Sequence, residues 1–469
     1  MPATGCRSGD VDTVPPSDER ETSCVPCTHG QPHHRRVTPE LSQRFGDGDP
    51  DAGRTGASPP LSLDPTDDAV GWVHTHLGHL TCDGPGRPGG IRGGERSARA
   101  ALAGFDVAGY AARRNEVLPV SRRGASGLSP YIRHGLLTLP EMWTTVADGP
   151  TRDRRKFRDE LLWQEYARHL YARVGRALGD DLRYTAAPTA NAPDDPWAGD
   201  LACVRFAVDE LETDGWLVNQ TRMWLASHWS VRHGADWRAG EDRFFRHLLD
   251  GSRAANRAGW QWTTGRVNGS AYGFSRRQVE RRAPGLCDSC AHRHRCPIEQ
   301  WPDDPRLDRA GADTADTDLS GAPDAGPDEP ELDASVPPAT AVWLTAESLG
   351  DSDPALVAHP DLPAVFVFDE PLLARLRLAT KRLVFLTECL ADLAERRSVE
   401  VYLGDPVEVL AGRALATTHS PVPGGARRRG ALTIAALHPW PWLRRPTNGP
   451  IGSFSAWRRG LESAQALTV

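Results

Sequence analysis

Apolar residues recur at three- and four-residue intervals through the stretch from Gly199 to Trp262. Such spacing places side chains on one face of a helix. The positions are Val204, Ala207, Val208 and Leu211, followed by Trp216, Leu217, Met223, Trp224, Leu225, Phe244, Phe245, Leu248 and Leu249. The pattern predicts packed helices with short joints and no strands. Together with helical patterns near residues 69, 93 and 157–170, it predicts a helical domain over residues 69–302.

The pattern changes beyond residue 340. Apolar runs at 341–346, 364–369, 399–403 and 431–437 are typical of strands, and residues 381–396 between them are typical of a helix. Strands that alternate with helices predict a small parallel α/β domain over residues 341–469. Residues 303–340 are acidic, rich in Pro, Ala and Gly and without a period, so we expect a flexible linker. Residues 1–68 are equally polar and predict a disordered tail.

The formal net charge of −7 is an average over unlike parts of the chain. The acidic linker carries much of the negative charge, and the helical region is rich in arginine, so a basic DNA-facing surface is compatible with the sequence. No apolar run reaches the roughly 18 residues of a membrane helix. The chain also opens without a charged and then apolar signal segment. We therefore expect a cytoplasmic protein.

Polar side chains are interleaved with the apolar face of the central helices. They are Asn219, Arg222, Asp250 and Asn256, and they alternate with Trp237, Trp260 and Trp262. Buried amides and ion pairs are tolerated when they are hydrogen-bonded, so this mixture indicates a flat, polar ligand held among helices. On composition alone, a Trp-rich helical core with polar surface residues accounts equally well for this sequence.

Three segments of this stretch carry a family resemblance. GWLVNQTRM (215–223), DWRAGEDRFF (236–245) and LLDGSRAANRAGWQW (248–262) closely resemble the flavin-binding domain of the DNA photolyase/cryptochrome family. The resemblance implies an all-helical FAD-binding domain. The segments after residue 340 resemble, less specifically, the antenna-type, Rossmann-like α/β domain of the same family. Because that domain comes first in the family, the resemblance implies a circularly permuted chain, and it leaves a second, antenna chromophore undecided.

The resemblance also assigns the flavin contacts. GASGLSPYIRHGLLT (124–138) is similar to the family's diphosphate-binding pattern, with Ala125 in place of the usual Thr. The implied cofactor-binding residues are Tyr110, Ser126, Leu128, Ser129, Arg222, Asp250, Ser252 and Asn256. In the family, the positions of Arg222 and Asp250 hold an ion pair beside the flavin ring, and that of Asn256 lies beside the flavin N5. Ser252 stands at a position where the family usually has an acidic residue.

The positions that face the substrate and carry electrons are assigned in the same way. The resemblance implies a lesion pocket formed by Glu160, Trp163, Asn219, Met223 and Trp262, and electron hopping through Trp260 and Trp237. Gln164 stands where photolyases usually carry Arg. The outermost hopping aromatic is open between Trp197 and Tyr184.

Nine cysteines are an odd number in a chain with no secretion signal, which favours metal binding or free thiols over disulfides. Cys287, Cys290 and Cys296 fall within ten residues and can chelate one metal centre if a fourth ligand joins them. Similarity to iron–sulfur bacterial cryptochromes and photolyases implies that Cys203 is this ligand and that the centre is a [4Fe–4S] cluster. Zinc, with His292 and His294 nearby, is the alternative, and Cys82 is the less favoured fourth ligand.

Three functions are open at this point. The resemblance implies first a deoxyribodipyrimidine photolyase, a lyase in which light-excited reduced FAD drives repair of pyrimidine dimers in DNA. The second is a cryptochrome-like blue-light photoreceptor that uses the same flavin and Trp chain, which Gln164 favours. The third is a light-independent iron–sulfur protein that binds nucleic acid. The presence of Asn256 and of the Trp pair argues against it. The sequence does not distinguish cyclobutane from 6-4 lesions.

Overall fold

The computed structural model describes residues 60–63, 68–186, 189, 191–300, 307–309, 319 and 321–466. Almost all of the predicted tail, residues 1–68, lies outside this range, as does most of the first half of the predicted linker. The described residues belong to one compact unit, Gly56–Val469. The domain limits at residues 302 and 340 stay a prediction.

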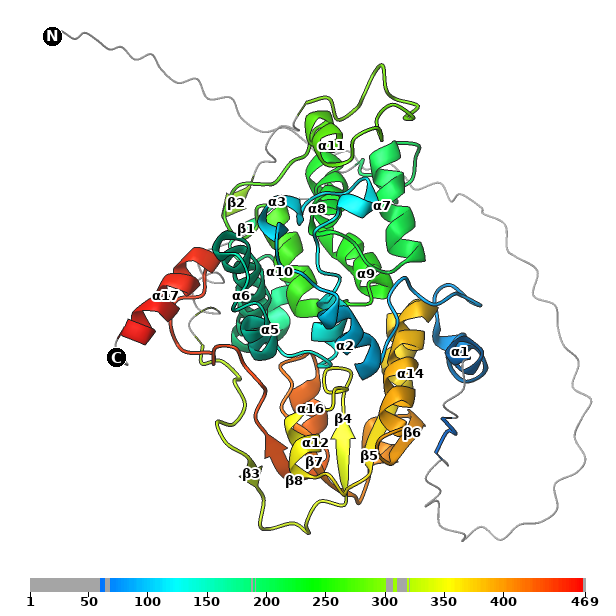
Figure 1. Ribbon diagram of the computed structural model, residues 1–469, viewed down its shortest axis with the longest axis vertical. Coiled ribbons are helices and arrows are strands. Elements are labelled where there is room, and N and C mark those ends of the chain that lie inside the picture. Colours follow the sequence, from blue (N-terminus) through cyan, green and yellow to red (C-terminus); the bar gives the residue numbers. More distant parts are fainter. Residues whose placement is uncertain are drawn as a thin grey trace, which may run out of the picture. The chain divides into compact units, whose positions relative to one another are not determined.

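Residues 69–282 are helical (Figure 1). The helices are α1 (Ala69–Leu77), α2 (Glu95–Ala103), α3 (Tyr110–Arg113), α4 (Ser129–Arg133), α5 (Leu139–Thr145), α6 (Thr151–Val174), α7 (Ala202–Thr213), α8 (Asn219–Ala226), α9 (Trp237–His247), α10 (Arg253–Thr263) and α11 (Arg276–Arg282). The helices predicted between Gly199 and Trp262 are confirmed as α7 to α10. Side chains fix where the last two begin, because Asp236 accepts from Arg238 N and Ser252 accepts from Ala255 N as N-caps.

The later part of the chain forms a six-stranded sheet with the order β3-β8-β7-β4-β5-β6. The strands are β3 (Glu331–Leu332), β4 (Ala341–Leu344), β5 (Ala364–Asp369), β6 (Val399–Gly404), β7 (Ala414–Thr418) and β8 (Thr433–His438). Strands β4 to β8 are parallel, and β3 pairs antiparallel with β8. A second, two-stranded sheet joins β1 (Tyr184–Thr185) to β2 (Asp308–Arg309).

The large sheet is therefore mixed, and the prediction of a purely parallel sheet is wrong at one edge. Strand β3 was missed because it is two residues long, exposed, and set within the acidic segment expected to be a linker. Strand β7 was missed because its sequence, ALATT, combines small residues with threonine and has no bulky apolar run. Its burial comes from neighbours on both sides, β4 and β8.

Helices cover the sheet: α12 (Pro354–Ala358), α13 (Glu370–Leu376), α14 (Thr380–Ala394), α15 (Pro406–Val409) and α16 (Gly425–Arg429). The strand order reverses between β4 and β7, and in such sheets a crevice opens at the carboxyl ends of the strands there. The chain ends in α17 (Phe454–Ala466), which packs on α6. No helix in the described ranges is long and apolar enough to cross a membrane.

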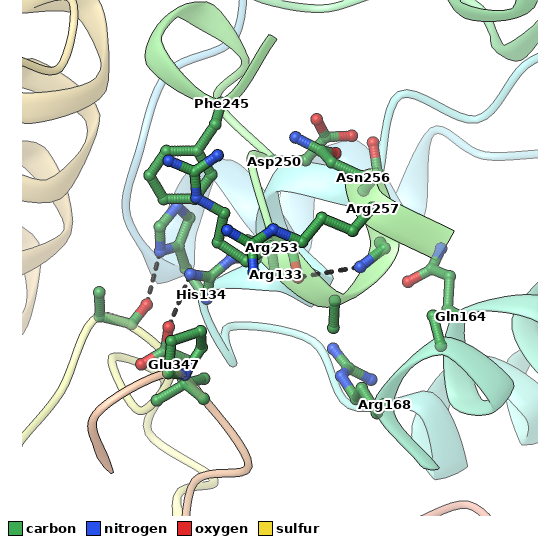
Figure 2. A pocket seen from close by; sticks show the side chains of 18 of the residues that line it. Arg133, His134, Gln164, Arg168, Phe245, Asp250, Arg253, Asn256, Arg257 and Glu347 are labelled. Carbon is green, nitrogen blue, oxygen red and sulfur yellow. Dashed lines mark hydrogen bonds and ion pairs between the residues drawn. The ribbon is translucent and has the colours of Figure 1, made fainter. Parts of the chain in front are cut away.

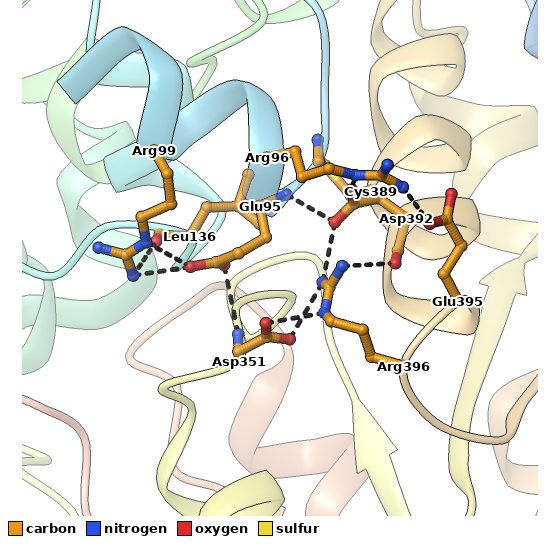
Figure 3. A network of polar contacts seen from close by, with 10 residues as sticks. Glu95, Arg96, Arg99, Leu136, Asp351, Cys389, Asp392, Glu395 and Arg396 are labelled. Atoms are coloured by element: carbon orange, nitrogen blue, oxygen red, sulfur yellow. Dashed lines mark hydrogen bonds and ion pairs between the residues drawn. The ribbon is translucent and has the colours of Figure 1, made fainter. Parts of the chain in front are cut away.

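Helix α14 joins the sheet to the helical part through the start of α2 (Figure 3). Three successive backbone N–H groups, those of Gly93, Gly94 and Glu95, donate to side chains of α14. The acceptors are Glu388 Oε2 at 2.6 Å, Cys389 Sγ at 3.2 Å and Asp392 Oδ2 at 2.9 Å. These bonds satisfy amide donors that the first turn of a helix leaves free. They also place the two parts in contact without relying on the segment between them.

The close approach of α2 to α14 depends on the absence of a side chain at Gly93. A methyl group there would overlap the carbonyl oxygen of Phe385 and would lie 3.0 Å from Cys389 Sγ. We expect Gly93→Ala to lower the free energy of unfolding by about 2 kcal/mol, as overpacking typically does. Urea unfolding of the purified protein measures this change.

Gly104→Ala is the matched control, because a methyl group at the other end of α2 would meet only Ala100 O at 3.5 Å and Ala101 O at 3.8 Å. Its free energy of unfolding should stay within about 0.5 kcal/mol of the wild-type value. Equal effects of the two substitutions would contradict a tight α2–α14 junction.

Candidate functional site

A cavity of about 1540 Å³ opens among the helices and continues to the carboxyl ends of strands β4, β5 and β7. Thirteen residues that the sequence analysis assigned to the flavin or the substrate line it: Tyr110, Ser126, Ser129, Glu160, Trp163, Asn219, Arg222, Met223, Asp250, Ser252, Asn256, Trp260 and Trp262. They come from segments spread over about 150 residues of sequence, so the fold brings them together. Their individual roles stay predictions.

Two assigned residues do not line the cavity but lie behind its wall. Leu128 is fully buried immediately before Ser129, the first residue of α4, and packs in the main apolar core. Trp237 is fully buried at the start of α9. Leu128 therefore anchors the proposed diphosphate loop in the core, and Trp237 is screened from the cavity.

An ion pair between Arg222 and Asp250 spans one side of the cavity. Arg222 Nη1 and Nη2 donate to the two carboxylate oxygens of Asp250 at 3.1 and 2.8 Å, and Arg222 Nε donates to Leu217 O. Burial raises the pKa of Asp250, but Arg222 and the hydroxyl of Ser129 outweigh it and hold the pKa below its usual range. Asp250 is therefore an anion that accepts from α8 and from the α4 loop.

Asn256 supplies a buried amide nitrogen, Nδ2, that lacks a partner among the described residues. Its side chain is 7% exposed, and within the described part of the chain its Nδ2 has no hydrogen-bond acceptor. Figure 2 draws Asn256 close to Asp250 at the cavity. An unsatisfied buried donor costs about 1–3 kcal/mol, so this amide fits a ligand that accepts its hydrogen bond.

Arginines line a part of the cavity that we call the sheet side, because Arg133 pairs with Glu347 after β4 and Arg382 lies on α14. Figure 2 labels Arg133, Arg168, Arg253 and Arg257 at the cavity. Arg253 and Arg382 lie over the ring of Phe245 at 4.0 and 4.7 Å, and Arg133 pairs with Glu347 at 2.6 Å.

Burial, followed by the neighbouring Arg133, lowers the pKa of Arg382 to about 9. Arg382 donates to the carbonyl oxygens of Phe245 and Gly251, which are neutral acceptors. This part of the cavity is therefore suited to an anionic group such as a diphosphate. The sequence analysis missed these arginines because each lies outside the resemblance or beside its matched positions.

The residues assigned to the lesion pocket are partly occupied by protein contacts. Glu160 pairs with Arg114 at 3.1 Å and with Lys156 at 2.9 Å. Trp163 stacks on Phe454, the first residue of α17, with ring centroids 3.8 Å apart and an angle of 9° between the planes. One face of Trp163 is therefore covered by the end of the chain.

Helix α17 is held firmly in this place. Trp457 is 4% exposed and donates its Nε1–H to His169 Nδ1 at 3.0 Å, and Arg458 pairs with Asp159. The sequence analysis assigned no role to this segment. The sequence feature that could have indicated this helix is the aromatic pair Phe454 and Trp457, because residues three apart lie on one face of a helix.

The four cysteines Cys203, Cys287, Cys290 and Cys296 line one small pocket. Leu201, Ala202, Leu286 and Ile298 complete its apolar wall, and Arg276, His292 and Arg293 lie at its edge. Burial raises the pKa of Cys203 to about 12, and the neighbouring thiols of Cys287, Cys296 and Cys290 add to the shift. Helix α7 and the segment after α11 therefore bring the predicted set together, while Cys82 is exposed elsewhere.

The arrangement does not match a site for a single metal ion. Among the described residues, no group of three or more His, Cys, Asp or Glu is arranged to hold one. A tetrahedral zinc ion, with bonds of about 2.3 Å to sulfur, would need sulfur atoms roughly 4 Å apart. Neither the predicted cluster nor the zinc alternative therefore has a formed set of ligands among the described residues, although the four cysteines line one pocket.

Comparison with known proteins finds a match for a segment of the helical part. Residues 202–280 match the family model described as the FAD binding domain of DNA photolyase. This segment is similar in sequence to the DNA photolyases. The chain is 30% identical over 198 residues to the deoxyribodipyrimidine photo-lyase of Synechococcus sp., covering 37% of this chain and 39% of that protein. It is 33% identical over 230 residues to the enzyme of a Thermus thermophilus strain, covering 45% and 50%.

The chain thus spans half or less of the length of these photolyase relatives. Among solved structures, a bacterial class III photolyase from Agrobacterium tumefaciens is similar at 26% identity, with a TM-score of 0.32, over 36% of this chain and 37% of that one. A TM-score this low does not establish a shared fold. The photolyase relationship therefore rests on the sequence of the helical part.

The Arg222–Asp250 pair offers a direct test of the cavity. Arg222→Ala would leave the buried carboxylate of Asp250 without its guanidinium, which typically costs about 3–5 kcal/mol. We expect the purified variant to lose most of its bound flavin, measured by visible absorption per chain.

Arg243→Ala is the matched control, because Arg243 also makes two ion pairs, with Asp195 and Glu212, but is not part of the cavity wall. It should keep the flavin content of the wild type. Full flavin occupancy in Arg222→Ala would show that the ligand lies elsewhere.

Proposed function

We propose that the chain binds FAD in this cavity and acts as a light-driven photolyase that repairs pyrimidine dimers in DNA. The observation that carries the proposal is the convergence of thirteen assigned residues on one cavity, in a domain matched to the FAD binding domain of DNA photolyase. The names of the relatives support the activity, since they are called deoxyribodipyrimidine photo-lyases.

The chain's own residues would hold the cofactor in distinct ways. Ser126, Ser129 and the arginines of the sheet side suit its diphosphate, and the Arg222–Asp250 pair suits the edge of its ring system. The free amide of Asn256 is available to donate to a ring nitrogen. When bound and reduced, FAD supplies an electron on absorbing light, which the dimer needs in order to split.

Glu160, Asn219, Met223 and the open edge of Trp163 would receive the flipped dimer, because they line the same cavity. The carboxylate of Glu160 can accept a hydrogen bond from a base, and its pairs with Arg114 and Lys156 keep it oriented. Nothing in this scheme requires a nucleophile or a general base from the protein.

A second candidate function is a blue-light photoreceptor with the same flavin. The stack of Phe454 on Trp163 favours it, because a flipped base and Phe454 cannot both lie on that face. In this case α17 would be the segment that responds to the state of the flavin. We rank repair first because the other lining residues remain open to the cavity.

Repair is tested with a dimer-containing oligonucleotide and the photoreduced protein. We expect dimer loss in blue light and none in the dark. Glu160→Gln, which keeps the shape and removes the charge, should lower the repair yield roughly tenfold, the effect of about 1.4 kcal/mol, at unchanged flavin content. Glu400→Gln is the matched control, since Glu400 of β6 pairs with Arg413 and does not line the cavity.

The same experiment separates the two functions. Dimers that persist under light with the wild-type protein but are lost with Phe454→Ala would show that α17 blocks repair, and would favour the photoreceptor. Dimers that persist with both proteins would contradict repair altogether.

For the cysteine pocket we propose a [4Fe–4S] cluster held by Cys203, Cys287, Cys290 and Cys296. Support comes from four thiols that face one apolar pocket and from the Cys-Pro that closes the set, a sequence feature of many cluster sites. The cluster would fix the start of α7 to the segment after α11.

Cys203→Ser should deplete iron and acid-labile sulfide from a wild-type value near four per chain, because a cluster needs its fourth thiolate. Cys82→Ser, in an exposed cysteine away from the pocket, should leave both unchanged. The measurement is metal and sulfide analysis after anaerobic purification. Stoichiometric zinc without sulfide would contradict the cluster, and iron retained in Cys203→Ser would move the fourth ligand elsewhere.

We also propose that the chain is circularly permuted relative to photolyases. Support comes from the order of its parts, with the helices α1 to α11 before the sheet, and from contacts such as Gly94 N to Cys389 Sγ that hold the parts together across about 295 residues of sequence.

A further inference from the structure

Trp237 makes a hydrogen bond that its neighbours do not. Its Nε1–H donates to Asp181 Oδ1 at 2.8 Å, and the Trp237 side chain is fully buried. The same carboxylate accepts from Arg266 Nε at 2.9 Å and Arg238 Nη2 at 3.2 Å, while Thr185 Oγ1 donates to its other oxygen at 2.8 Å. The indole thus contacts a carboxylate that is itself fixed on three sides.

Trp237 and Trp260 belong to the same buried cluster of apolar side chains, and Trp260 also lines the cavity. Gly240, one turn further along the buried face of α9, sits directly against the rings of both Trp260 and Trp229. Residues three apart on a helix have Cβ atoms about 5–6 Å from each other, so Trp237 is one turn from this contact. Trp237 and Trp260 are therefore packed in one part of the core, on and beside the buried face of α9.

The other tryptophans near Trp260 have neutral partners or none. Trp260 Nε1 has no hydrogen-bond partner among the described residues. Trp197, whose ring centroid is 6.4 Å from that of Trp260, donates to Leu225 O, and Trp229 donates to Asp236 O. Of the four tryptophans described at this place, Trp237 is the one whose N–H meets an ionised group.

This difference affects where a positive charge is most stable. An indole that has lost an electron carries positive charge at its N–H, and a carboxylate there stabilises it far more than a carbonyl does in a buried site. Arg238 lies over the Trp237 ring at 4.9 Å and opposes this effect, but its guanidinium is paired with both Asp181 and Asp236. Trp197 has a similar cation over its ring, Arg243 at 5.0 Å, without a carboxylate at its N–H.

Asp181 is ionised under ordinary conditions. Burial raises the pKa of its carboxyl, but the hydrogen bond from Trp237 and the charge of Arg266 outweigh burial and hold the pKa below its usual range. A carboxylate that keeps its charge can stabilise an oxidised neighbour without taking up its proton.

We propose that Asp181 is a positioning residue that makes Trp237 the site where positive charge settles during photoreduction of the flavin. The inference deepens the proposed function and rests on it, because it needs flavin in the cavity. Trp260 would give one electron to the photoexcited flavin, Trp237 would give one electron to the oxidised Trp260, and a thiolate reductant in solution would return one electron to Trp237 and become a thiyl radical. No proton has to move between the protein groups, since Asp181 stays ionised throughout.

The test is transient absorption of oxidised tryptophan in the flavin-loaded protein. Asp181→Asn keeps the size of the side chain and an oxygen that can accept from Trp237 Nε1, and removes the charge. We expect the lifetime of the oxidised-tryptophan signal to fall at least about tenfold, at unchanged flavin content. Asp195→Asn is the matched control, because it removes a carboxylate that pairs with Arg243 beside Trp197. It should retain the wild-type lifetime.

The same measurement in a Trp237→Phe variant shows whether Asp181 acts through Trp237. Trp237→Phe should shorten the signal at least as much as Asp181→Asn, and the double variant should shorten it no further. A long-lived signal in Trp237→Phe overturns the inference even if Asp181→Asn fails to fold. An unchanged lifetime in Asp181→Asn, or an equal loss in Asp195→Asn, overturns it while leaving the proposed function standing. Absence of bound flavin in the wild type would instead sink the proposed function.

Discussion

The bidentate ion pair between Arg222 and Asp250 is the interaction on which the site depends. It joins α8 to the turn before α10, and Asp250 also accepts from Ser129 beside α4, so one carboxylate ties three segments of the cavity wall together. Two charges taken out of water are stable only with such complete pairing. The pair therefore fixes the geometry of the cavity wall. It also offers polar atoms to a ligand bound in the cavity.

The cavity also needs the sheet, although every residue assigned to it by resemblance lies in the helical part. Arg382 of α14 donates to Gly251 O, next to Asp250, and Glu347 after β4 pairs with Arg133 of α4. The side chains of Glu388, Cys389 and Asp392 hold the start of α2 against the same helix α14. The positive wall of the cavity thus arises where the two parts meet, and separating them would open the site.

Much of the helical part could be predicted, because periodic apolar residues indicate the helices α7 to α10. The N-cap residues Asp236 and Ser252 mark where α9 and α10 begin. The assigned residues converge on one cavity because α3, α6, α8 and α10 and the turns before α4 and α10 each place some of them there. The stack of Phe454 on Trp163 could not be predicted, because it joins residues about 290 positions apart, and the helical spacing of Phe454 and Trp457 does not indicate what they pack on. The antiparallel strand β3 was hidden likewise, because Glu331 and Leu332 gain their order from pairing with β8.

A flavin held by Asn256, Arg222 and Asp250 within reach of Trp260 is the central claim of this account. The most direct measurement is the flavin released by denaturing the protein as purified from its expression host in the dark, expressed per chain and identified by chromatography. The account predicts FAD at close to one molecule per chain. Protein that is folded but carries no flavin, and that takes up none when FAD is added, would contradict it.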